Sequence, residues 1–511
     1  MSCIINILTG GFLFHNPYQK NQHLTGKWLE IRFYSCHNEL STFTQEVLNM
    51  SVPQGLLPFK VIPDSDKSIL TSFAGLPLVI ETMRALKVHN TVDNYLVIKK
   101  RQSGKYTESD YVESFVALLA SGGECLDDFD RLQSDRGLKE LGLNIPSSES
   151  ARFFLYAFHD EEKLKDRPEK GAFIPQETQP LQNLFKVQEN IIKRVHGNPT
   201  IATIDQDAVV IESTKDEARM TYLAHRGYQP VVNYWAEKDL ILKDEFRDGN
   251  VPAAYNLFDS LKASIEMLPD SIKEVRCRAD SAAYNHDLMS SLRKMEVRGR
   301  KITVRYAISA DMTEALRSEI ERLPEDVWKP LRKITDKGLI EGRKEWAEVV
   351  FVPNKAVQTD RYLAIRVRPS QGELFADGNL YHYFAVVTNM WDGERLLRWH
   401  REKCGTVEKV HDVVKNDLGG GVMPCGRFFS NAAWWRLNCI AYNIISVMKQ
   451  KALPDAWLSY RMKALRFFLI GVAGKVIRTG RQIYLRFSGM PSICEIFREA
   501  RGRLVHLHDT T

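Results

Sequence analysis

Between residues 200 and 309 the sequence switches repeatedly between two hydrophobic periods. Apolar residues first alternate with polar ones, or run together with β-branched and aromatic residues, as is typical of strands. Amphipathic segments at the helical period then come between further strand-like runs. The strand-like runs are "TIATIDQDAVVIES", "GYQPVVNYWAE", "DLILKDEF", "EVRCRAD" and "KITVRYAIS", and the helix-like ones are "AAYNLFDSLKASIEML" and "NHDLMSSLRKM". The pattern predicts the order β-β-β-α-β-α-β.

A three-strand meander followed by α/β units is the chain order of the ribonuclease-H-like fold. We therefore predict an α/β fold with a ribonuclease-H-like catalytic core, whose first part covers residues 166–310. Residues 311–390 carry three further strand-like runs, "EWAEVVFVP", "RYLAIRVRP" and "YHYFAVVTN", which indicate a β-rich insertion. The long helical patterns that follow place the second part of the core at residues 391–452.

The segments on either side of this core differ from it in hydrophobic periodicity and in residue types. Residues 1–66 mix Gly, Pro, Asn and aromatics without periodicity, and we predict an irregular N-terminal extension. Residues 67–165 are predicted to be helical, because Thr107 and Asp110 stand at capping-box spacing before an apolar periodic run that ends in Gly-Gly. Several short helices suit a DNA-binding region and equally a plain bundle. Residues 453–511 are predicted to be a basic helical region.

Positive charge is concentrated in that C-terminal region, although the net charge of the whole chain is only +6. Between Ser459 and Arg503 only Glu495 and Glu499 oppose the basic side chains, and aromatic and aliphatic residues interleave with them. The pattern predicts a folded basic surface, which is either a solvated face or a face that binds a polyanion. The basic residues are Arg461, Lys463, Arg466, Lys475, Arg478, Arg481, Arg486, Arg498, Arg501 and Arg503.

Composition narrows the class of protein further. The hydrophobic share of 44% and the charged share of 26% are ordinary for a folded soluble protein, and no apolar run reaches the length that spans a bilayer. The apolar start has no basic flank, so we expect no signal peptide. The cysteines are scattered without a C-x-x-C pair, which suits a reducing compartment rather than a zinc site or a disulfide framework. We therefore expect a cytoplasmic protein without a membrane segment.

Acidic residues stand where two of the predicted strands end. Asp205 and Asp207 lie on one face of the first strand, since side chains alternate with period two, and "TIATI" and "AVVI" mark that strand as central. Asp280 ends a later strand. It could cap a helix, but the next helical pattern begins near Asn285, which is itself a good cap. Paired carboxylates at the ends of central strands would attract a hard divalent cation.

The helical segment after the insertion offers a third acid, Glu408. Gly405 and Thr406 suit a helix start, and the helix dipole favours a Glu in the first turn. Lys415 shares the face of Glu408, and so does His411, which we expect to pack or to face solvent rather than to bind metal. A solvated Glu–Lys face explains the same pattern.

Several ordered motifs together resemble one family. They are "DQDAVV", "VRCRADSAAY", "REKCGTVEKVHDVVKND" and "GRFFSNAAWWRLNCIAYN", with "SFAGLPLVIETMRALKV" and "ESFVALLASGGECLDDFDRL" near the N-terminus. The set resembles the DDE transposases of bacterial insertion sequences, in particular the branch with a Tyr-x2-Arg-x3-Glu-x6-Lys signature. The resemblance runs from about Lys67 to the C-terminus.

The resemblance implies that three acids bind two divalent ions, Mg²⁺ or Mn²⁺. Carried over, the acids are Asp207, Asp280 and Glu408, and Asp205 stays an alternative for the first because Val209 stands where the family usually has Thr. The signature's Lys falls on Lys415.

The signature is not matched throughout. Its Arg appears as Lys403, with Cys404 as an apparent insertion, and its Tyr position is occupied by Trp399, His400 and Arg401. The resemblance implies that Lys403, Lys415 and Arg401 contact DNA phosphates.

The activity implied is metal-dependent cleavage of DNA and strand transfer at the ends of an insertion sequence. The partners implied are double-stranded terminal inverted repeats and target DNA, bound by a homodimer on paired ends in the bacterial cytoplasm, at the nucleoid. Two alternatives remain from the residues: a ribonuclease-H-like nuclease or resolvase that cuts without joining, and a non-catalytic DNA-binding derivative.

Overall fold

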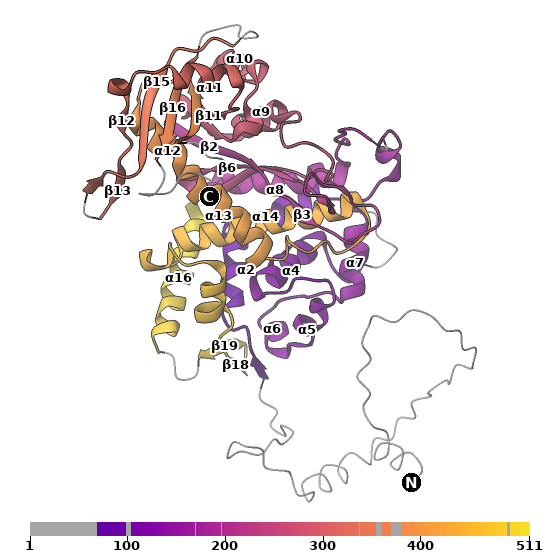
Figure 1. The fold of residues 1–511 in the computed structure, drawn as a ribbon. Helices are drawn as coiled ribbons and strands as arrows, with labels where there is room; N and C mark the ends of the chain where they lie inside the picture. Colours follow the sequence, from indigo (N-terminus) through magenta and orange to yellow (C-terminus); the bar gives the residue numbers. More distant parts are fainter. Residues whose placement is uncertain are drawn as a thin grey trace, which may run out of the picture. The chain divides into compact units, whose positions relative to one another are not determined.

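A mixed sheet of nine strands forms the centre of the fold, with the order β12-β15-β16-β17-β11-β8-β2-β6-β7 (Figure 1). The computed structural model describes residues 69–98, 104–168, 170–195, 197–336, 338–353, 360–368, 380–487 and 491–510, which belong to one compact unit spanning Ser68–Thr511. The predicted N-terminal extension, residues 1–66, lies outside the described residues.

The five predicted core strands are confirmed as members of this sheet. They are β2 (Ile201–Ala208), β6 (Val231–Trp235), β7 (Leu240–Glu245), β8 (Glu274–Ala279) and β11 (Thr303–Ala310). β2, β6 and β7 pair antiparallel as a meander, whereas β8 and β11 run parallel to β2. The crossovers between the parallel strands contain the predicted helices, α9 (Leu257–Met267) and α10 (His286–Arg293).

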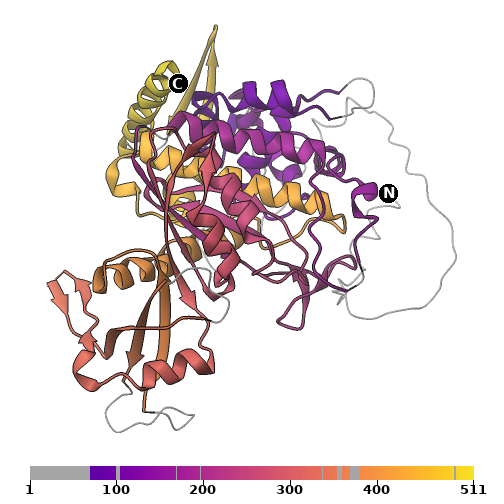
Figure 2. The ribbon, with the colours of Figure 1, turned by 90° about the horizontal axis from the view of Figure 1, so that it is seen from above.

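The β-rich insertion continues the same sheet. Its predicted strands appear as β15 (Lys344–Val349), β16 (Arg361–Val367) and β17 (His382–Thr388), with the short β12 (Lys329–Pro330) at the sheet edge. β17 pairs antiparallel with β11, so the insertion is hydrogen-bonded directly to the core. Figure 2 shows these strands gathered on one side of the described unit.

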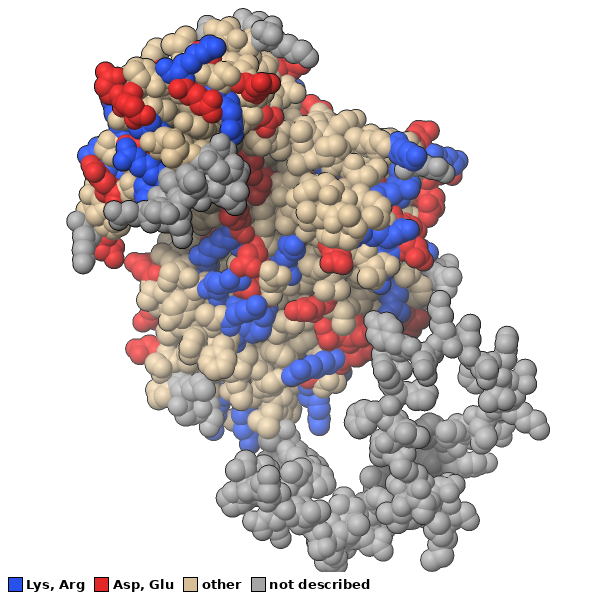
Figure 3. Space-filling model, in the orientation of Figure 1, with Lys and Arg blue, Asp and Glu red and all other residues tan. Residues whose placement is uncertain are grey.

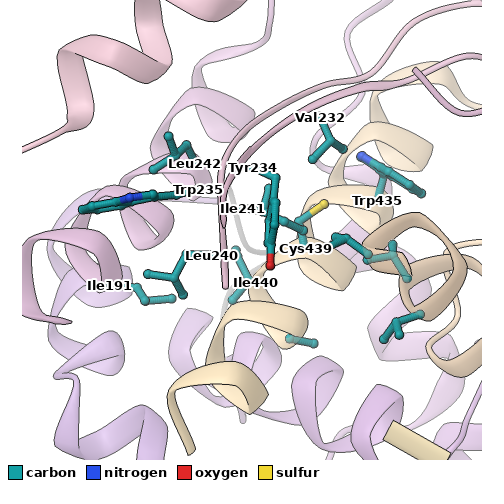
Figure 4. Packing of buried hydrophobic residues seen from close by; sticks show 14 of the residues in the cluster. Ile191, Val232, Tyr234, Trp235, Leu240, Ile241, Leu242, Trp435, Cys439 and Ile440 are labelled. Atoms are coloured by element: carbon teal, nitrogen blue, oxygen red, sulfur yellow. The ribbon is translucent and has the colours of Figure 1, made fainter. Parts of the chain in front are cut away.

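The opposite edge of the sheet is covered by helices. α14 (Phe428–Lys451) is buried over most of its length and packs against β7, α8 (Gln179–Val195) and α4 (Glu108–Ser121). In Figure 4, Tyr234 and Ile241 lie on the side of the strands that faces Cys439 and Ile440 of α14, whereas Trp235 and Leu242 lie on the other side. α14 is thus buried on all sides rather than along one stripe, and its buried polar residues, such as Arg436 and Asn443, are hydrogen-bonded.

The predicted N-terminal helices are present, with α2 (Leu76–Ala85), α3 (Val88–Tyr95), α4, α5 (Asp128–Ser134), α6 (Arg136–Glu140) and α7 (Ser148–Tyr156). Thr107 and Asp110 form the predicted capping box of α4, and Gly122 ends the helix in the left-handed conformation. None of the described helices is both long and apolar enough to cross a bilayer.

The C-terminal region is not purely helical as predicted. Between α15 (Met462–Leu465) and α16 (Pro491–Thr510) lies a hairpin of β18 (Gly474–Thr479) and β19 (Gln482–Phe487). Gly480 has a φ of 59°, which suits the tight turn of the hairpin. β18 also pairs with β1 (Ile69–Thr71) and α16 packs on α2, so the two end regions of the described chain form one body.

Candidate active site

Asp207 and Asp280 stand together where two parallel strands end. β2 and β8 are neighbours in a register that pairs Gln206 with Ala279, so the residue after each pair lies at the same edge of the sheet. The Asp207 side chain is 16% exposed and that of Asp280 is 57% exposed. Ligands of α/β sheets bind at this edge, beyond the carboxyl ends of the strands.

Asp280 does not cap a helix with its side chain. The helix that follows, α10, is capped by Asn285, whose Oδ1 accepts from the backbone N–H groups of Asp287 and Leu288. The expectation from the sequence is confirmed, and the carboxylate of Asp280 stays available at the strand end.

The ammonium group of Lys403 lies between the two carboxylates. Its Nζ is 2.6 Å from Oδ1 of Asp280 and 3.4 Å from Oδ1 of Asp207, and the Lys403 side chain is only 2% exposed. Burial, together with repulsion from Asp280, raises the pKa of Asp207 to about 6 although Lys403 opposes the shift. Two acids this close need a cation to stay ionised together.

Asp205 has a different role from Asp207, although both lie on β2. Its carboxylate is fully buried and accepts from Nε and Nη2 of Arg278 at 2.5 and 2.8 Å, and from the hydroxyl of Thr406. Both of its oxygens are therefore already bound within the protein. Asp207 is the acid of this strand that faces Asp280.

Arg278 also fixes the segment that carries Lys403. Its Nη1 donates to the carbonyl of Trp399 at 2.6 Å, and its guanidinium lies over the Trp399 ring. Nε2 of His400 lies 3.3 Å from the carbonyl of Ala279. Sequence reasoning missed Arg278 and Thr406. The signal for the Arg278–Asp205 pair was an Arg on the next parallel strand, opposite an Asp inside a central strand.

Glu408 lies in the first turn of α13 (Val407–Asp412), as predicted, and its side chain is exposed. The thiol of Cys404 lies beside it, and burial together with the charge of Glu408 raises the pKa of that thiol. The charge of Asp280 also raises the pKa of this thiol. Within the described ranges, no three acidic, His or Cys side chains are arranged closely enough to hold a metal ion.

The donor set nevertheless fits a hard divalent ion. Asp207 and Asp280 supply carboxylate oxygens, and the desolvated Asp207 next to a second acid is a group that a cation would stabilise. Glu408 would complete the set by moving towards the pair.

His411 is buried rather than facing solvent, so of the two expected placements only packing is confirmed. Its Nε2 is 3.6 Å from Oδ2 of Asp207, and both of its ring nitrogens are without a hydrogen-bond partner. Burial and the charges of Lys403 and Lys415 lower the pKa of His411 to about 3, which keeps the imidazole uncharged at neutral pH.

Lys415 and Arg401 come from the helical segments that flank the turn of Lys403. Lys415 lies in a π-helical turn, Val413–Asp417, that continues α13, and its Nζ donates to the carbonyl of Val210 just after β2. The predicted single long helix is therefore a short α-helix with a π turn. Arg401 is exposed at the end of α12 (Glu394–Arg401).

Much of the basic C-terminal surface is paired within the chain. Figure 3 shows Lys and Arg side chains between the positions labelled α13 and α16 in Figure 1, with acidic side chains among them. The pairs are Arg461 with Asp412 and Asp417, Lys463 with Asp417, Arg478 with Glu140, Arg501 with Glu81 and Arg503 with Glu499. Part of this charge is therefore structural rather than free for a polyanion.

Comparison with known proteins gives a family for the chain. The family model described as "Transposase DDE domain group 1" matches residues 60–509. Among solved structures, a piggyBac transposase in a synaptic complex with hairpin DNA is 11% identical, with a TM-score of 0.41, and the match covers 79% of this chain and 81% of that one. No curated protein sequence matches.

Proposed function

We propose roles for the site residues from one premise: the chain belongs to the transposase DDE domain family, group 1, and is a DDE-type DNA transposase. The first two catalytic acids are Asp207 and Asp280. The observation that carries this assignment is their meeting at the ends of adjacent parallel strands, with a buried cation between them. Glu408, on the helix that lies over these strand ends, is the third acid.

The acids would hold Mg²⁺ or Mn²⁺, in two sites. Bound there, the ions would activate a water or a DNA 3′-hydroxyl and stabilise the leaving oxygen of the cleaved phosphodiester. Asp207 and Asp280 supply the fixed part of the set, because Asp207 lies on β2 and Asp280 directly follows β8. Glu408 supplies the movable part, because its side chain is exposed and stands on a short helix beside Cys404.

The basic groups around the acids suit the phosphates of DNA. Lys415 is anchored on the loop after β2, and the exposed Arg401 stands on α12 beside the site. Phosphate contacts of this kind position the duplex without reading its sequence. Lys403 joins them once it leaves the carboxylates.

The finer assignments follow the same reasoning. Numbered along the chain, the core strands have the sheet order 3-2-1-4-5, with only the second strand antiparallel to the other four, which supports a ribonuclease-H-like core. The motif set supports a bacterial insertion sequence as the element, with cleavage and strand transfer at its terminal inverted repeats. We propose a homodimer on paired ends, acting in the bacterial cytoplasm.

The test is a cleavage and strand-transfer assay on a duplex that carries the element's end. Asp207→Asn, Asp280→Asn and Glu408→Gln should each abolish cleavage while binding of the end persists. Cleavage without joining by the parent protein would favour a nuclease or resolvase. Full activity of Asp207→Asn together with loss in Asp205→Asn would show that the assignment on β2 is wrong.

A further inference from the structure

Lys403 occupies a position that its sequence context does not suggest. It lies in a single 3-10 turn, Glu402–Gly405, between α12 and α13, where a Lys would ordinarily extend into solvent. Instead its side chain is 2% exposed, and its ammonium contacts Asp280 and approaches Asp207.

Charge explains this position. Two carboxylates at the ends of neighbouring strands repel each other, and one of them, Asp207, is largely withdrawn from water. The ammonium group offsets that repulsion with one positive charge. A divalent ion between the same oxygens would offset it with two, and both cations cannot occupy the gap at once.

We propose that Lys403 is a resident counter-ion of the active site, which holds Asp207 and Asp280 together until a divalent ion displaces it. The inference rests on the proposed function, because it takes these two acids as metal ligands. It adds an exchange of cations to that function: the ion enters as the ammonium leaves.

The surrounding contacts allow the side chain to move while its backbone stays. On one side Arg278 holds the Trp399 carbonyl, and on the other the Thr406 hydroxyl is bound to Asp205. Gly405, two residues along the chain, has open space where a side chain would stand. Rotation of the flexible four-carbon stem of Lys403 is thus enough to carry its ammonium out of the gap.

The displaced ammonium needs a new anionic partner, and a DNA phosphate beside the acids is one. Metal loading and DNA engagement would then assist each other, because the phosphate stabilises the state in which the gap is free for the ion. Without DNA, the ion must compete with Lys403 and should bind weakly.

The experiment measures Mn²⁺ binding to the metal-stripped full chain by electron paramagnetic resonance, with and without end-bearing DNA. Lys403→Met should bind Mn²⁺ at least about tenfold more tightly without DNA, since one unit charge a few ångströms away is worth more than that factor at the effective dielectric of a protein site. DNA should tighten Mn²⁺ binding to the parent and have a smaller effect on Lys403→Met. The matched control, Lys409→Met, removes the same charge from an exposed position on α13 and should behave as the parent.

A second measurement uses the parent protein alone, so it does not depend on how a variant folds. Acetylation of lysines, read by mass spectrometry, should leave Lys403 protected in metal-free protein and should modify it when Mg²⁺ is added. Unchanged Mn²⁺ affinity in Lys403→Met, or unchanged protection with Mg²⁺, would overturn the proposal. Asp207→Asn separates a failure of the cation exchange from a failure of the proposed function. If this variant binds Mn²⁺ as the parent does, the proposed metal ligands themselves are wrong.

Discussion

Arg278 on β8 binds both carboxylate oxygens of Asp205 on β2, with its Nε at 2.5 Å and its Nη2 at 2.8 Å. The two residues face each other in the parallel register, and both are almost completely buried. The pair thus joins two central strands, while Asp207, two residues on, lies beside Lys403 at the edge of the sheet.

The first prediction follows from the different contacts of Asp205 and Asp207. Asp205→Asn should lower the free energy of unfolding by about 3–5 kcal/mol, because it leaves the buried Arg278 without its charge partner. Asp207→Asn should abolish cleavage without such a loss, since its neighbour Asp280 repels it. Urea unfolding of both variants beside the cleavage assay checks this, and equal stability of Asp205→Asn and the parent would contradict it.

The second prediction concerns acid stability. Burial alone would raise the pKa of Glu177, but the charges of Arg436 and Lys243 outweigh it and lower that pKa to about 2. Because the folded pKa lies below the unfolded value, the ion pair stabilises the fold fully above about pH 4.5 and loses that contribution as the pH falls towards 2.

Glu177→Gln should therefore be less stable than the parent at pH 7, and the difference should shrink as the pH falls through that window. Thermal unfolding measured from pH 7 to pH 3 tests this. Glu189→Gln is a suitable control, since among the described residues Glu189 forms an ion pair with the half-exposed Lys186 alone. A difference between Glu177→Gln and the parent that is independent of pH would contradict the prediction.

The third prediction concerns the metal. A carboxylate set should give cleavage with Mg²⁺ or Mn²⁺ and none with Ca²⁺, whose longer bonds and looser geometry should still permit assembly on DNA. His411, buried with its Nε2 3.6 Å from Oδ2 of Asp207, is a nitrogen ligand that could bring in a softer ion. When each ion is added back to metal-stripped protein, the same ions should restore cleavage by the parent and by His411→Ala. Activity restored by Zn²⁺ alone, and lost in His411→Ala, would overturn the carboxylate set.

The fourth prediction concerns the start of the chain. The family model begins at residue 60, so the segment before it lies outside the family's shared part. Deleting residues 1–45 should leave folding, end binding and transposition largely intact. Circular dichroism, a DNA-binding assay and a transposition assay on the shortened protein give the answer, and failure to fold or to bind ends would show that the segment is integral.

The sequence allowed the core strands and most helices to be predicted because their periods are unambiguous. β2, β8 and β11 carry buried apolar residues at strand spacing, and the caps of α4 and α10 are local signals. Such features depend on residues close together in the chain, which one sequence displays directly.

What failed depended on contacts between distant residues. The hairpin of β18 and β19 was predicted to be helical. β18 also pairs with β1, from the other end of the described chain, and no local pattern displays that pairing. The sequence also suggested that Lys403 contacts phosphate. Nothing local indicates that its ammonium enters the gap between two acids that come from different strands.

The pairing of β1 with β18 joins segments near opposite ends of the described chain. During synthesis, β1 and the helices after it leave the ribosome long before β18 is made. The packing of α2 against α16 likewise has to form after the end of the chain is made. Contacts of such large sequence separation form late and slowly. A chain cut short before the hairpin would therefore keep its three acids and still lack the strand that closes its N-terminal helices. Such nascent or truncated products are the ones we expect cellular proteases to remove first.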